Sequence, residues 1–108
     1  MAILNMILPA VSGITASNAN RGTSLSANHT YIVAVIGHGG VSNSSTSKTI
    51  YQPTAYSITL TNNATYETIT AGVYKVVTGS SSSTLTVTVT ISNKAQQKRI
   101  AAYYFTIG

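Results

Sequence analysis

The strictest alternation of apolar and polar residues in the chain spans residues 84–91. Every odd position there is aliphatic and every even position is threonine. A period of two is typical of a β-strand with one face buried and the other in water. We therefore expect the odd positions to point into a core and the threonines to form an outward hydroxyl row. The expected core row is Leu85, Val87, Val89 and Ile91.

Two further segments are nearly continuous apolar runs. Residues 31–36 and residues 100–107 are rich in β-branched, small apolar and aromatic side chains, and both runs are too short for an independent buried helix. Such runs are typical of strands that are covered on both faces. Residues 31–36 therefore predict a central, doubly covered strand, which the glycine-rich residues 37–40 bring to an end.

The middle of the chain carries shorter strand patterns. Residues 56–61 alternate, and the two asparagines at 62–63 predict a tight turn because Asn tolerates left-handed backbone angles. Residues 65–69 are the expected hairpin partner of that first strand. Residues 73–78 form another strand pattern, and the serine-rich residues 79–83 after it predict a flexible hairpin loop.

These patterns together predict an all-β protein. No window shows a 3.6-residue apolar period, and strong helix formers are scarce. Several short strands separated by turn signals indicate a single antiparallel β-sandwich, immunoglobulin-like or jelly-roll-like, of about seven or eight strands. A chain of 108 residues is expected to form one domain, residues 1–108.

Residues 1–28 are less regular, and their apolar start allows two interpretations. It is either a first edge strand or an arm exchanged with a neighbouring subunit, which would hide an apolar edge. The arm residues are Ile3, Leu4, Met6, Ile7 and Leu8. The segment lacks the basic region of a secretory signal, and no part of the chain supplies the about 20 apolar residues of a transmembrane helix.

Composition excludes most catalytic chemistry. Only 6% of residues are charged, cysteine is absent and Glu67 is the only acidic side chain. Carboxylate-pair hydrolysis, Asp-assisted triads and thiol chemistry all need residues that are missing. His29 and His38 are the only histidines, and a metal site would need further ligands. We expect neither enzymatic activity nor a cofactor or metal.

The net charge of +5 bears on the choice of partner. The only cluster of cations is Lys94, Lys98 and Arg99, and no aromatic nucleic-acid-binding strand or basic helix accompanies it. A weakly basic surface of this kind favours an acidic protein partner over nucleic acid. The tyrosines could stack on sugars or anchor a protein interface, or most of them could pack in the core with the hydroxyl reaching the surface. They are Tyr31, Tyr51, Tyr56, Tyr66, Tyr74, Tyr103 and Tyr104.

The order of the strand patterns resembles a known group of proteins. The patterns at residues 29–37, 73–77, 85–90 and 98–105 are similar to small β-sandwich modules in virion proteins of tailed bacteriophages. Such modules occur in head-decoration and tail proteins. The resemblance covers about residues 29–107. It departs from the group at Tyr74, where such modules often carry a tryptophan, which this chain lacks.

The resemblance implies a non-enzymatic protein of the virion surface, assembled in the host cytoplasm. The first expectation is a capsid decoration or cement protein that binds the assembled shell. Lys94, Lys98 and Arg99 would contact the major capsid protein or another virion protein, and the N-terminal arm would join subunits of a homo-oligomer. A trimer would match the local three-fold axes on which decoration proteins often sit.

The alternative is a tail-fibre or adhesin-type module that recognises a cell-surface glycan. Its contacts would come from loop tips at residues 37–47 and 79–83 and from exposed tyrosines.

Overall fold

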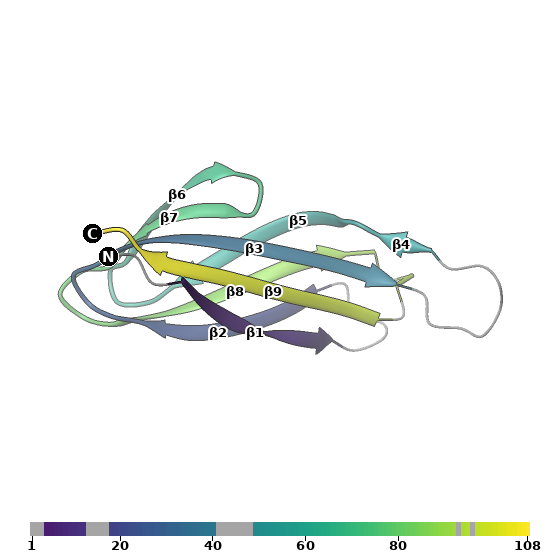
Figure 1. Ribbon diagram of the computed structural model, residues 1–108, viewed down its shortest axis with the longest axis horizontal. Coiled ribbons are helices and arrows are strands. Elements are labelled where there is room, and N and C mark those ends of the chain that lie inside the picture. The colour runs from purple at the N-terminus through teal and green to yellow at the C-terminus, as the bar shows by residue number, and fades with distance from the viewer. Residues whose placement is uncertain (1–3, 13–17, 41–48, 93, 96) are drawn as a thin grey trace.

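A computed structural model gives the arrangement of the chain (Figure 1). It describes residues 4–12, 18–40, 49–92, 94–95 and 97–108. Within these residues every regular element is a β-strand, and all strand pairs are antiparallel.

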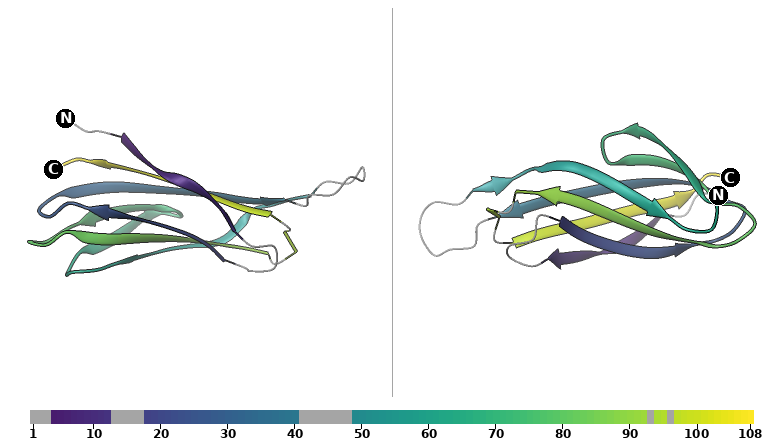
Figure 2. Two further views of the ribbon diagram at one scale, coloured as in Figure 1. Left: turned by 90° about the horizontal axis from the view of Figure 1, so that it is seen from below. Right: turned by 180° about the vertical axis from the view of Figure 1, so that it is seen from behind.

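Two sheets pack face to face, as the view from below shows (Figure 2). The larger sheet has the order β1-β9-β3-β7-β6, with β4 paired to the end of β3. Its strands are β1 Leu4–Ser12, β3 Thr30–Gly40, β4 Ile50–Tyr51, β6 Thr65–Thr70, β7 Val73–Val77 and β9 Gln97–Thr106. The smaller sheet has the order β2-β8-β5, and its strands are β2 Asn18–Leu25, β5 Pro53–Leu60 and β8 Ser83–Ile91. The predicted antiparallel sandwich is confirmed.

Strand β8 supplies the centre of the core between the sheets. The predicted core row of Leu85, Val87, Val89 and Ile91 is 0% exposed at every position. The larger sheet contributes the facing aliphatic residues, which are Val33, Val35, Val76, Ile100 and Ala102. Full burial of one such Val, Leu or Ile side chain contributes about 1.5–3 kcal/mol to stability.

Strand β3 is central in its sheet, but it is covered on one face only. Val33 and Val35 are buried against the smaller sheet, whereas Ile36 on the other face is 57% exposed. The prediction that residues 31–36 are covered on both faces is therefore wrong. A continuous apolar run shows that both faces are apolar, but it does not show that a second layer of the same chain covers each of them.

The connections also differ from the expected hairpins. Asn62 and Asn63 do form a turn, with positive φ angles of 55° and 63°. That turn leads from β5 in the smaller sheet to β6 in the larger one, and β6 pairs with β7. The serine-rich residues 79–83 likewise cross between sheets, because β7 and β8 lie in different sheets. Alternation identifies the buried face of a strand but not its neighbour.

Candidate interaction surfaces

The structure separates the predicted basic cluster. Lys98 and Arg99 are consecutive residues of β9, so their side chains point to opposite faces of the sheet. Lys98 is 0% exposed, and its Nζ donates a hydrogen bond to the Ala95 carbonyl oxygen at 3.0 Å. The predicted surface contact through Lys98 is therefore wrong, because its side chain lies buried inside the sandwich.

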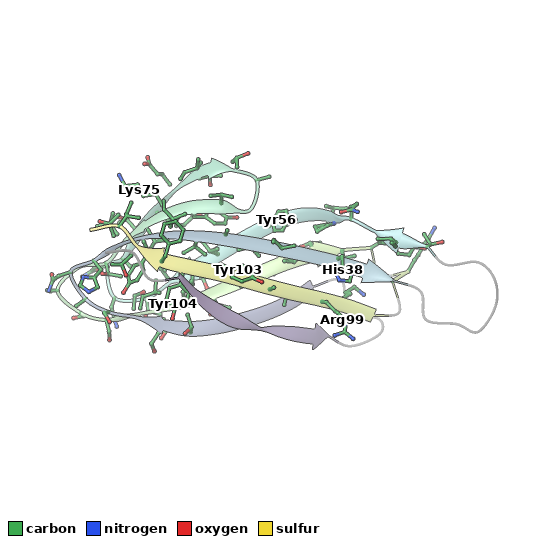
Figure 3. The ribbon with its side chains drawn as sticks, in the orientation of Figure 1. His38, Tyr56, Lys75, Arg99, Tyr103 and Tyr104 are labelled. Atoms are coloured by element: carbon green, nitrogen blue, oxygen red, sulfur yellow. The ribbon has the colours of Figure 1, made fainter. Side chains whose placement is uncertain are left out.

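The other two cations of the cluster lie on the surface. Lys94 is exposed in a turn in which the Ala95 N–H donates to the Ser92 carbonyl oxygen at 3.0 Å. Arg99 is exposed on the outer face of the larger sheet, opposite His38 of β3 (Figure 3). The predicted contact is thus reduced to two separate positions.

The N-terminal segment is an edge strand of its own chain. Strand β1 pairs with β9 from Leu4 opposite Phe105 to Ser12 opposite Lys98, with an irregularity around Pro9. The segment that holds Leu4, Met6, Ile7 and Leu8 is thus part of this intramolecular sheet, and Ile3 lies outside the described residues. Of the two interpretations of residues 1–28, the edge strand is the one that this pairing supports.

The outer face of the larger sheet carries an apolar stripe that the sequence analysis did not single out. Directly opposed residues share a face of a sheet, and three such pairs join β3 and β9 here. The pairs are Ile32 with Phe105, Ala34 with Tyr103, and Ile36 with Ala101. All six side chains are at least partly exposed. We call these six residues the outer stripe.

Cations lie at both ends of the outer stripe. At one end Arg99 and His38 form the next opposed pair, beside a shallow hollow of about 290 Å³ that also contacts Ile36 and Ala101. At the other end Lys75 of β7 is paired with Ile32. Figure 3 shows Arg99 and Lys75 at opposite ends of the sheet. The signal that could have identified the stripe was the two-sided apolar run at residues 31–36.

A second candidate surface is a groove between β5 and the β6–β7 hairpin. It has a volume of about 300 Å³. Within the described part of the chain, its lining contains two tyrosines, two threonines and no charged side chain, and consists of Pro53, Thr54, Ala55, Tyr56, Thr68, Ala71, Gly72 and Tyr74. The sequence singled out the tyrosines but could not show which of them meet.

Gly72 fixes the position of the hairpin beside β5. It has a φ of 77° in the turn between β6 and β7, and its carbonyl oxygen accepts a hydrogen bond from the Val35 N–H at 2.7 Å. A Cβ at this position would lie 2.8 Å from the Val35 oxygen and 3.5 Å from the ring of Tyr56. Only glycine permits this approach, which brings the Tyr56 ring against the hairpin turn.

Three tyrosines gather along the same open side of the sandwich. The rings of Tyr66 and Tyr74 meet edge to face, with centroids 5.6 Å apart and an interplanar angle of 83°. Burial raises the pKa of the Tyr74 hydroxyl above its ordinary value, and the nearby Tyr66 and Tyr56 raise it further. Tyr74 is therefore neutral at physiological pH and available as a hydrogen-bond donor.

The described part of the chain contains no group of three or more His, Cys, Asp and Glu residues that could hold a metal ion. Among the same residues, no helix has the length and apolar character needed to cross a membrane. Comparison with known proteins found no matching family model, no matching curated protein and no matching solved structure.

Proposed function

We propose that this protein is a non-enzymatic structural protein of a virion surface, a decoration or cement protein that attaches to an acidic shell protein. The observation that carries the proposal is the outer stripe with Arg99 at its end. An apolar centre with polar or charged residues at its border is the usual composition of a protein interface. The attachment is non-covalent and needs no cofactor.

Charge argues for an acidic partner. Glu67 is the only acidic side chain of the chain, and it lies opposite Lys75 in the β6–β7 pairing. Arg99 is instead opposite His38 on one side and Val11 on the other, so neither neighbour neutralises it. A second copy facing this surface would bring its own Arg99 and a chain whose net charge is +5. The outer stripe thus suits an acidic shell protein better than the outer stripe of a second copy. The predicted homo-oligomer would form through other surfaces.

The copy number of the chain in purified virions is the first test. Quantitative mass spectrometry against the major capsid protein should give on the order of hundreds of copies per particle if the chain covers a symmetric shell. A few dozen copies would place it in the tail, and its absence from particles would refute a virion role. Either of these results overturns shell attachment.

A matched pair of variants tests the surface itself. Arg99→Gln and Thr59→Glu each lower the net charge by one, but Thr59 is exposed on the smaller sheet. We expect Arg99→Gln to weaken binding to purified shells by about three- to tenfold at low salt, and Thr59→Glu to leave it unchanged. Equal effects of both variants would show that only net charge matters, which contradicts binding through the outer stripe.

A further inference from the structure

We propose that the groove between β5 and the β6–β7 hairpin binds a neutral saccharide unit. This site is separate from the outer stripe, because it lies on the inner side of β7. Tyr74 points inward from that strand into the groove, whereas Lys75 lies on the face of the outer stripe. The proposal therefore does not rest on shell attachment.

The groove lining offers the two kinds of contact that a sugar ring needs. A pyranose has apolar C–H faces that pack on aromatic rings and a rim of hydroxyls that donate and accept hydrogen bonds. Tyr56, which is half-buried, supplies the ring, the buried Tyr74 forms part of the wall, and the exposed Thr54 and Thr68 supply hydroxyls. The Thr54 hydroxyl already donates to the Thr90 carbonyl oxygen at 3.2 Å, so its own oxygen can still accept a hydrogen bond.

The absence of charge from the groove lining selects for a neutral ligand. The protein is strongly basic as a whole, yet among the residues that the structure describes no lysine, arginine or histidine lines the groove. An anionic sugar or an acidic peptide would find no counter-charge there, and a cation would find no carboxylate. A volume of about 300 Å³ is at the small end of ligand pockets and suits one ring of a glycan rather than an extended peptide.

The groove is also preorganised. Its floor is held by the Gly72–Val35 hydrogen bond, and one wall by Tyr74, which is 4% exposed. Figure 3 shows Tyr56 on β5 close to the turn of the hairpin. Because these groups are fixed before binding, a ligand orders little of the protein when it enters. We expect millimolar affinity for one ring.

The test is an NMR titration of the full chain with neutral methyl glycosides of galactose, glucose, mannose and N-acetylglucosamine. At about 50 mM each, a site of millimolar affinity is nearly saturated. We expect at least one glycoside to shift the backbone amide signals of Ala55, Thr68, Ala71 and Gly72, with signals of the outer stripe unchanged. No shift with any of them would overturn the proposal.

Two variants separate the groove from the rest of the surface. Thr68→Trp fills the groove from an exposed strand position, and Thr59→Trp adds the same bulk on an exposed position of the smaller sheet. Thr68→Trp should weaken glycoside binding about tenfold or more, and Thr59→Trp should not. Equal glycoside binding by both folded variants would refute the groove as the site. The saccharide proposal would also be wrong if proline-rich peptides shifted the same amide signals and glycosides did not. Neither result bears on the virion copy number.

Discussion

Gly37 of β3 packs directly against Val89 of β8. A Cβ placed on it would lie 2.5 Å from Val89 Cγ1 and 3.1 Å from Val89 Cγ2. Both residues belong to the core layer, since Gly37 is buried and Val89 is 0% exposed. A methyl group at this point cannot fit unless the sheets separate or Val89 moves. We expect Gly37→Ala to destabilise the fold by about 1–3 kcal/mol, the usual cost of overpacking a core.

The same geometry predicts a specific rescue. Val89→Ala alone removes two buried methyl groups and should cost about 2 kcal/mol, at about 0.8 kcal/mol per group plus a cavity term. In the double variant the new methyl at position 37 occupies the space that Val89 vacates. The double variant should therefore be less destabilised than the two single costs combined, by about 1 kcal/mol or more.

Urea unfolding followed by far-UV circular dichroism measures these free energies, and Gly40→Ala is the matched control. Gly40 lies in the same strand, but a Cβ there would meet no atom of the described residues within 4 Å. We expect that control to change stability by less than about 1 kcal/mol. Additive costs in the double variant, or a Gly37→Ala variant as stable as Gly40→Ala, would refute the close approach of β3 and β8.

Two further predictions follow from single buried groups. Because burial raises the pKa of Tyr74 above its ordinary value near 10, the folded state holds that proton more tightly than the unfolded state. The stability that this difference in pKa gives the folded state is complete below pH 10 and is lost as the pH rises through the folded-state pKa. The Tyr74→Phe variant should therefore lose less stability than the original protein when urea unfolding is repeated at increasingly alkaline pH. The Thr78 hydroxyl donates to the Ser26 carbonyl oxygen at 2.7 Å and accepts from the His29 N–H at 3.0 Å. Thr78→Val keeps the side-chain shape but leaves the Ser26 carbonyl oxygen and the His29 N–H without this hydrogen-bond partner. Thermal or urea unfolding should therefore show a loss of about 1–3 kcal/mol in the free energy of unfolding; an unchanged midpoint would contradict this.

The sequence predicts the faces of the strands better than their neighbours. The threonine alternation at residues 84–91 identified the fully buried row of β8, because a period of two directly reports which side meets the core. It could not show that β8 pairs with β2 and β5 rather than with β7. Pairing depends on turns such as Ala71–Gly72, where a positive φ and a tertiary hydrogen bond decide the path of the chain.

The candidate surfaces were less predictable for the same reason. Adjacent charges in the sequence suggested one basic patch, but consecutive strand residues face opposite ways, so Lys98 and Arg99 diverge. Tyr56 and Tyr74 lie far apart in the chain and meet because β5 and the β6–β7 hairpin border the same open side of the sandwich. Only the tertiary fold brings such residues together.

Strand β7 borders a different candidate surface on each of its faces. Its inward residue Tyr74 lines the groove, and its outward residue Lys75 lies at one end of the outer stripe. A shell that covered the outer stripe would therefore leave the groove accessible, and one copy could hold the particle and a sugar at once. Thr68→Trp should then weaken glycoside binding about tenfold or more with shell binding unchanged, and Arg99→Gln should weaken shell binding about three- to tenfold with glycoside binding unchanged. If either variant impaired both activities equally while remaining folded, the two faces of β7 would not act independently, and one binding surface would have to account for both.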